Sequence, residues 1–167
     1  MHVDGLKGYG FTATRLDVHG VVDAVVVHGP GTTVTAAWLH DLRHYAVDPG
    51  QGGGPSHDDG VQVQAGTGIR LIGNVIDGGA NSALQVTQDV GVTSDLELTG
   101  NWLDGGACTV NVAEKGRGPI EGLVVSDNLF GRRSSVPGCA ATVPTSTPLV
   151  ADDNRYDDGQ PVTIRRD

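Results

Sequence analysis

The chain repeats a pattern of alternating apolar and polar residues that ends in Gly-Asn or Asp-Asn. Alternation predicts a β-strand, and glycine or aspartate before asparagine marks a bend where a left-handed backbone is tolerated. A second short stretch of strand type follows in each period. We therefore predict two or three short strands per repeat. The four clear copies align without gaps at residues 68–79, 95–106, 122–133 and 148–159.

Equivalent residues recur at a period of about 27 residues. A weaker fifth copy lies at 32–43, where Ala37 replaces the asparagine and Trp38 aligns with Trp102. Hairpin sandwiches lack such columns, whereas a solenoid stacks like residue on like in successive turns. We predict a single all-β domain over 1–167, a parallel β-helix of about five to six coils. The chain begins directly in strand-like sequence, which indicates truncation at its N-terminus.

The asparagines that close the four clear copies form one column. Coils of a parallel solenoid stack about 4.8 Å apart, which is the ordinary spacing between strands. An inward asparagine can then donate its amide to the next one, so that buried polar groups are paired. A preference of asparagine for turns is the simpler explanation, but four in one column favour a ladder. Its members are Asn74, Asn101, Asn128 and Asn154.

This repeat resembles the right-handed parallel β-helix of the pectate-lyase superfamily. More narrowly, it is similar to bacterial secreted β-helix repeat proteins that carry a His-Asp-Asp-Gly-Val-Gln segment, here residues 57–62. The resemblance covers roughly residues 10–160 and implies a right-handed solenoid. The superfamily includes lyases, hydrolases, epimerases, phage spikes and adhesins. The function must therefore be argued from a site rather than from the fold.

Composition and charge narrow the classes of function. The 26 glycines and 8 prolines would interrupt any long helix. A net charge of −9, with only 11 basic residues, disfavours binding to a nucleic acid, which requires a basic patch. No apolar stretch is long enough to span a membrane. No signal peptide is visible at the N-terminus.

The two cysteines occupy one column of neighbouring repeats. Aligning the second strand places Cys108 above Cys139, and their separation is one period plus about four loop residues. Column neighbours in adjacent coils have Cα atoms close enough for a disulfide. We predict this bond, with two buried thiols as the alternative. A disulfide indicates an oxidising compartment and hence a secreted, extracellular protein.

A glycine-rich insertion at 44–56 interrupts the repeat after the weak copy and returns at residue 57. Long loops on a regular scaffold are where binding and catalytic sites are usually built. The residues beside the insertion are rich in histidine and aspartate, and outward polar residues follow on the next strands. The candidate cluster is His40, Arg43, His44, Tyr45, His57, Asp58 and Asp59, beside the polar positions Gln62, Gln64, Gln85 and Asn111.

Three interpretations of this cluster remain open. In a polysaccharide lyase, Arg43 would neutralise a uronate, His44 or His57 would act as base, and Tyr45 would act as acid. Asp58 and Asp59 could instead hold Ca²⁺, the one cofactor considered, or act as the carboxylates of a glycosidase together with Asp41. A zinc site formed by the histidines is disfavoured because His40 and His44 would share a face only on a helix. In the third interpretation, the two aspartates cap the loop and the histidines are surface residues.

We expect a secreted protein that binds or cleaves a polysaccharide or oligosaccharide, with a non-catalytic structural or adhesive domain as the alternative. His44, His57, Asp58 and Asp59 are expected to border one open groove beside Gln62 and Gln85. Replacement of both aspartates by asparagine would then abolish binding or turnover and leave thermal stability nearly unchanged.

Overall fold

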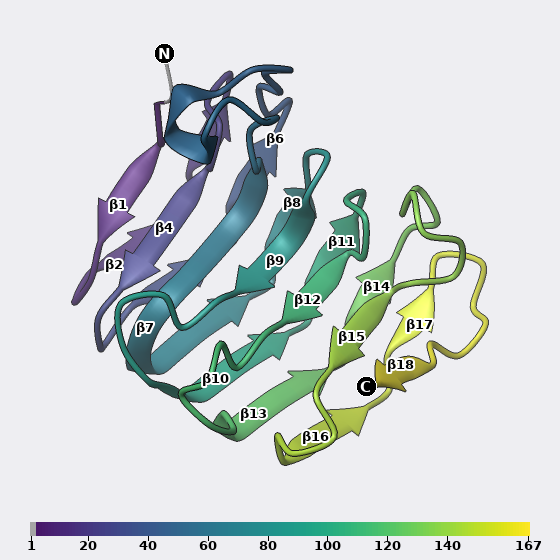
Figure 1. Ribbon diagram of the computed structural model, residues 1–167. Helices are drawn as coiled ribbons and strands as arrows, with labels where there is room; N and C mark the ends of the chain where they lie inside the picture. The colour runs from purple at the N-terminus through teal and green to yellow at the C-terminus, as the bar shows by residue number, and fades with distance from the viewer. Residues whose placement is uncertain (1–2) are drawn as a thin grey trace.

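The computed structural model describes residues 3–167, and its regular structure is almost entirely β (Figure 1). All pairs of named strands are parallel, and the strands form three faces. The exception to β-structure among these residues is one turn of 3₁₀-helix, η1 (Pro49–Gln51). The long strand β7 (Asp59–Ile72) runs from the first face into the second, so that those two faces form one continuous sheet.

Successive strands visit the three faces in turn. Face A contains β1 (Leu6–Gly8), β4 (Val25–His28), the first half of β7, β9 (Ser82–Val86), β12 (Val110–Val112), β15 (Ala141–Val143) and β18 (Ile164–Arg166). Face B contains β2 (Thr12–Thr14), β5 (Thr33–Thr35), the second half of β7, β10 (Thr93–Thr99), β13 (Glu121–Ser126) and β16 (Leu149–Asp152). Face C contains β3 (Asp17–His19), β6 (Trp38–His40), β8 (Val75–Asp77), β11 (Trp102–Asp104), β14 (Leu129–Phe130) and β17 (Arg155–Tyr156).

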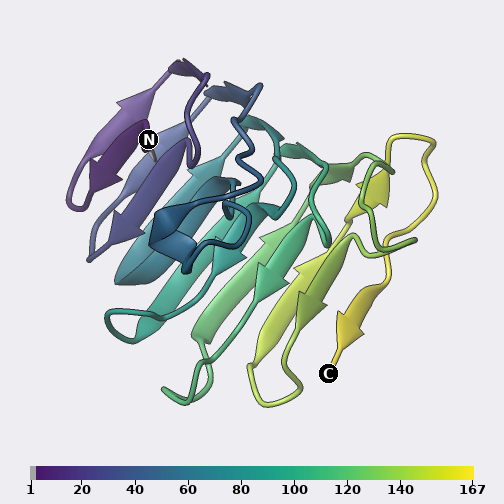
Figure 2. The same ribbon diagram turned by 45° about the horizontal axis from the view of Figure 1, so that its top comes forward.

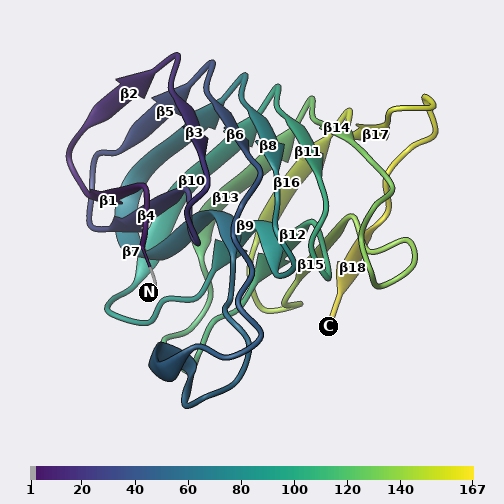
Figure 3. The same cartoon turned by 90° about the horizontal axis from the view of Figure 1, so that it is seen from above.

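Each strand pairs with its counterpart one repeat later, as β1 does with β4, β2 with β5 and β3 with β6. Figure 3 shows these strands side by side along the molecule. The pairing is in register, because Leu96 of β10 lies between Ile69 and Leu123 of the neighbouring strands. These three side chains are buried in a common core. The parallel sheets are consistent with a parallel β-helix.

The sequence pattern does not identify the first coil, formed by β1 to β3, as a copy of the repeat. Asp17 pairs with Trp38, only 21 positions later, and Leu16 precedes it where the clear copies have asparagine. A shorter period and a different bend residue hide this copy from a search for columns spaced by 27.

Hydrogen bonds join the four asparagines at the bend between faces B and C. The backbone N–H and Nδ2 of Asn74 both donate to Oδ1 of Asn101, at 2.9 and 3.0 Å. The same pair of bonds links Asn101 to Asn128 and Asn128 to Asn154. Ala37 donates its N–H to Oδ1 of Asn74 at 3.0 Å. The ladder therefore begins at the weak copy, whose alanine supplies a donor but no side-chain acceptor.

Cys108 and Cys139 form the predicted disulfide between neighbouring coils, with Cα atoms 4.8 Å apart. No helix within residues 3–167 is long and apolar enough to cross a membrane.

Reduction of this disulfide should lower the free energy of unfolding by about 3–4 kcal/mol, since the bond closes a loop across 31 positions of the unfolded chain. Chemical denaturation with and without a reductant measures the difference. A Cys108→Ser/Cys139→Ser variant should show the reduced stability and respond to reductant no further. Free thiols in the unreduced, unfolded protein would contradict the bond.

Candidate functional site

The inserted loop leaves face C after β6 and returns to face A at β7, and it is closed at its base (Figure 2). The backbone N–H of Tyr45 donates to Oγ of Ser56, and the N–H of Ser56 donates to the carbonyl of Tyr45, both at 2.8 Å. Within the loop, Asp48 caps η1 by accepting the N–H of Gly50 at 2.8 Å. These bonds give the loop a defined conformation of its own.

Asp58 anchors the loop to the body of the protein. Its side chain is 1% exposed, and Oδ1 lies 2.7 Å from Nδ1 of His44, at the start of the loop. Oδ2 accepts the backbone N–H of Ala80 in the following repeat. A Cβ at Gly79 would overlap the Asp58 carboxylate, so glycine is required there to admit it. Both oxygens of Asp58 are therefore engaged by protein donors.

Asp59 is fully buried behind Asp58. Its backbone N–H donates to Oδ1 of Asp23 at 2.9 Å, and Oδ1 of Asp59 accepts Nδ2 of Asn81 at 2.8 Å. Among residues 3–167, Oδ2 of Asp59 finds no hydrogen-bond partner. Burial, followed by the negative charges of Asp23 and Asp58, raises the pKa of the Asp59 carboxyl well above its ordinary value.

An open groove of about 270 Å³ lies on the outer side of face A beside the inserted loop. Gln62 and Gln64 alternate with the buried Val61, Val63 and Ala65 and point outward, and Nε2 of Gln64 donates to Oε1 of Gln62 at 2.9 Å. Thr87 contributes a buried hydroxyl for which the described part of the chain supplies no hydrogen-bond partner. Ion pairs join Lys7 to Asp4 and Lys115 to Asp89, each at 3.2 Å. The full lining is Asp4, Lys7, Asp23, Gln51, His57, Gln62, Gln64, Thr87, Asp89 and Lys115.

The structure brings together only part of the predicted cluster. His57, Gln62 and Gln64 line the groove, but His44, Asp58 and Asp59 do not. The expectation that all four loop residues border one groove is therefore not met. The physical reason is that the loop folds back through His44 onto Asp58, which buries the carboxylate instead of presenting it.

The remaining candidates separate further. Arg43 and Tyr45 line a second hollow, together with Val3 and residues 20–22. Gln85 lies between Gln62 and Asn111 in register, yet it is 7% exposed and its Oε1 accepts the Ser82 hydroxyl at 3.1 Å. The lyase set of Arg43, a histidine and Tyr45 is thus divided between two hollows.

A calcium site at Asp58 and Asp59 also lacks a suitable arrangement. Within residues 3–167, no group of three or more His, Cys, Asp or Glu side chains is arranged to hold a metal ion. The oxygens of Asp58 already accept hydrogen bonds, and the one unpartnered oxygen of Asp59 is buried. The two carboxyl groups are buried at the loop junction rather than facing a ligand.

Face C carries a stacked group that the sequence did not reveal. His40 has Nε2 2.9 Å from Asp17 and Nδ1 2.7 Å from Asp41, and its ring lies 3.6 Å from that of Trp38. Burial lowers the pKa of His40, but its hydrogen bonds to the two aspartates outweigh this and raise it. The available signal was the Trp-Leu-His alternation, which places Trp38 and His40 on one side of a strand. Asp17 comes from the coil that the repeat search missed.

No family model, curated protein or solved structure matches this chain. The resemblance to the pectate-lyase superfamily therefore rests on the sequence repeat, with which the parallel sheets are consistent.

Proposed function

We propose that the chain is a right-handed parallel β-helix of the pectate-lyase type that binds an oligosaccharide or polysaccharide along the outer side of face A. The fold is supported by the return of the strands to the same three faces in every repeat and by the asparagine column at one bend. The disulfide supports an extracellular location, because such bonds persist in oxidising compartments.

The amide pair at Gln62 and Gln64, both partly exposed to the groove, carries the proposal of a sugar ligand. Amides and hydroxyls offer both donors and acceptors, which is the chemistry that sugar hydroxyls require. The two lysines of the lining are already paired with Asp4 and Asp89, and the whole chain has a charge of −9. A neutral glycan fits this groove better than a polyuronate, which would be repelled.

Binding is favoured over cleavage because the two aspartates proposed as catalysts are buried and hydrogen bonded. A general acid or base must reach the atom whose proton it transfers. Asp58 is 1% exposed and Asp59 is 0% exposed, and neither lines the groove. Of the loop histidines and aspartates proposed for catalysis, His57 alone is a groove residue.

Replacement of both groove amides, Gln62→Ala/Gln64→Ala, should weaken glycan binding at least tenfold, since each side chain contributes about 1 kcal/mol of hydrogen bonding. Calorimetric titration of the intact protein with neutral and uronate hexasaccharides measures the change. Gln160→Ala is the matched control, because Gln160 is exposed in a loop near the C-terminus. Equal affinity in the double variant, or no binding by the parent protein, would refute the groove as the ligand site.

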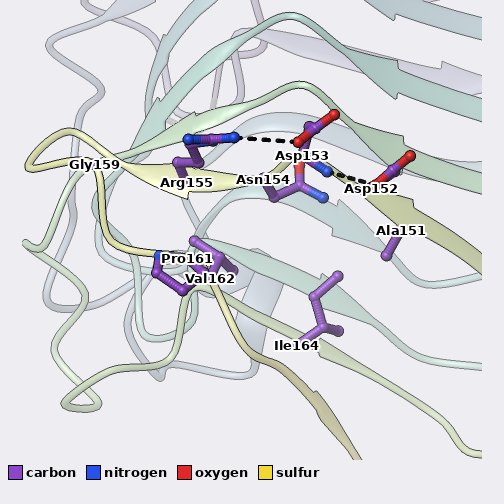
Figure 4. A pocket seen from close by; sticks show the side chains of 9 residues that line it. All are labelled: Ala151, Asp152, Asp153, Asn154, Arg155, Gly159, Pro161, Val162 and Ile164. Atoms are coloured by element: carbon purple, nitrogen blue, oxygen red, sulfur yellow. Dashed lines mark hydrogen bonds and ion pairs between the residues drawn. The ribbon is translucent and has the colours of Figure 1, made fainter.

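A non-catalytic structural or adhesive role is the second candidate. The strand edge at the end of the sheet that contains β16 favours it. A hollow of about 520 Å³ lies there, between β16 and the segment that leads to β18 (Figure 4). In the part of the chain that the structure describes, β16 pairs only with β13, so its outer edge is free. Free edges promote association between chains, although the charged Asp152, Asp153 and Arg155 along this end oppose it. Sedimentation that shows end-to-end oligomers, without glycan binding, would favour this role.

A further inference from the structure

Face C presents a narrow outward ridge of large apolar side chains at the level of the stacked histidine. Trp38 pairs with Val75, Val75 with Trp102, and Trp102 with Leu129, so that the four form one column. Trp38, Val75 and Leu129 are 50%, 40% and 48% exposed, and Trp102 is partly exposed. Figure 3 shows β6, β8 and β11 side by side, on the opposite side of the view from the inserted loop.

We propose that this ridge is a second glycan-binding surface, which takes an unbranched neutral oligosaccharide by stacking pyranose rings on Trp38 and Trp102. It is separate from the groove of face A and does not depend on it. Two strand spacings separate the tryptophans, which is about 9.6 Å. This distance is comparable to that between every second ring of an extended pyranose chain. The C–H groups on a sugar face complement the negative face of an indole.

The Trp38 ring is held in place before any ligand arrives. Its indole lies against the His40 ring at 3.6 Å with an interplanar angle of 17°. His40 is fixed in turn by Asp17 and Asp41 through both ring nitrogens. An aromatic group that is already oriented loses little conformational freedom on binding, which favours affinity. The remaining exposed half of Trp38 is available to a sugar.

Charged groups border the ridge. Asp17 pairs with Trp38 at the head of the ridge column, and its side chain is 61% exposed, while that of Asp41, next to His40, is 84% exposed. Asp77 on β8 and Asp104 on β11 form a charged row two positions after the ridge residues; Asp77 is partly exposed and Asp104 is buried. Arg133 reaches both Asp77 and Asp104. The exposed carboxylates and the Arg133 guanidinium can accept and donate bonds to the hydroxyls at the rim of a sugar, while the buried Asp104 holds Arg133 in place. Its acidic residues disfavour an anionic glycan.

A second copy of the chain is a poorer occupant of the ridge. A stable protein interface buries about 800 Å² on each partner around an apolar centre. The ridge is one side chain wide, between the bend that contains Gly73 and Gly100 and the charged row. Such a line suits a chain of single rings better than a protein surface.

The test uses the intrinsic fluorescence of the intact protein, because Trp38 and Trp102 are its only tryptophans. Titration with cellohexaose, xylohexaose and mannohexaose should give a saturable change in tryptophan emission with at least one of them. Hexagalacturonate should give none. The Gln62→Ala/Gln64→Ala variant should retain the tryptophan response, which separates failure of the ridge from failure of the groove.

Calorimetry on ridge variants made in the Gln62→Ala/Gln64→Ala background, in which the groove no longer contributes, completes the test. Trp38→Leu and Trp102→Leu should each weaken binding about tenfold, the loss expected for one stacked ring. Tyr9→Leu, which removes an exposed aromatic ring between β1 and β2, should leave it unchanged. Circular dichroism identifies any leucine variant that has unfolded. If Trp102→Leu unfolds, Trp102→Phe takes its place, and it should bind the hexasaccharide more tightly than a leucine variant does. The proposal of a glycan-binding ridge is refuted if no neutral hexasaccharide alters the tryptophan emission. It is also refuted if sedimentation shows that the parent protein is a dimer and that the tryptophan variants are monomers.

Discussion

Replacement of Asn101 by alanine should lower the free energy of unfolding by about 5 kcal/mol, because it breaks the asparagine ladder at its centre. Oδ1 of Asn101 accepts two bonds from Asn74, and Nδ2 donates to the carbonyl of Leu71 and to Oδ1 of Asn128. Alanine removes all four bonds. The backbone N–H of Asn74 would then be a buried donor without a partner among the described residues, in a site that is 1–2% exposed. Nδ2 of Asn74 would keep only its bond to the carbonyl of Val34, at 3.0 Å.

The matched control for this substitution is Asn154→Ala at the last rung. Asn154 also accepts two bonds from its neighbour, but it is 9% exposed, so water can replace part of what is lost. We expect about half the effect at this position. Urea denaturation followed by far-ultraviolet circular dichroism measures both. Equal losses in the two variants would mean that the asparagines act as independent turn residues, and the ladder would not contribute as a unit.

The features of the fold that could be predicted are those that stacking forces to repeat. A buried amide is satisfied only by a partner one coil away, so the ladder required asparagine at every level from residue 74 to residue 154. The same logic placed Cys108 above Cys139. Leu16, at the first level, lies in the same column but obeys no such requirement. A column of equivalent residues can therefore be recognised in the sequence only where the interactions at that position require the same residue in every coil.

The candidate site could not be predicted to the same extent because burial there depends on the path of the insertion. A His-Asp-Asp sequence does not indicate whether its carboxylates face solvent or are buried in the protein. His44 and Ser56 bring the ends of the loop onto Asp58, and Gly79, from the next repeat, leaves the space that the carboxylate fills. Nothing within residues 57–62 indicates that glycine. The outward direction of Gln62 and Gln64, by contrast, follows from alternation alone.

Asp58→Ala should lower the free energy of unfolding by about 4 kcal/mol, which replaces the expectation of nearly unchanged stability. The carboxylate loses its bonds to His44 and to the N–H of Ala80, at roughly 2 kcal/mol each, and the longer bond from the Ser56 hydroxyl at 3.4 Å. The loop also loses its anchor to the body. Thermal denaturation measures the stability, and limited proteolysis should show faster cleavage at the exposed Gly52 and Gly53.

Asp59→Asn is the informative contrast to Asp58→Ala. The Asp59 carboxylate is buried without full pairing, so its replacement should raise the free energy of unfolding at neutral pH instead of lowering it. The raised pKa means that the folded protein holds the Asp59 proton more tightly than the unfolded chain does. Its contribution to stability is therefore greatest below the ordinary pKa of 3.8 and is lost as the pH rises from there through the raised value. Asparagine cannot ionise, and it keeps an oxygen for Nδ2 of Asn81.

The Asp59→Asn variant should consequently match the parent protein at low pH and be more stable at neutral pH. Denaturation curves collected across this range test the sign directly. Asp58→Asn should not show the same gain, because its amide would place a second donor against the N–H of Ala80 or against His44. If Asp59→Asn destabilises the protein at neutral pH while Asp58→Asn does not, the roles assigned to the two carboxylates are reversed. Asp59 would then be the charged anchor of the junction.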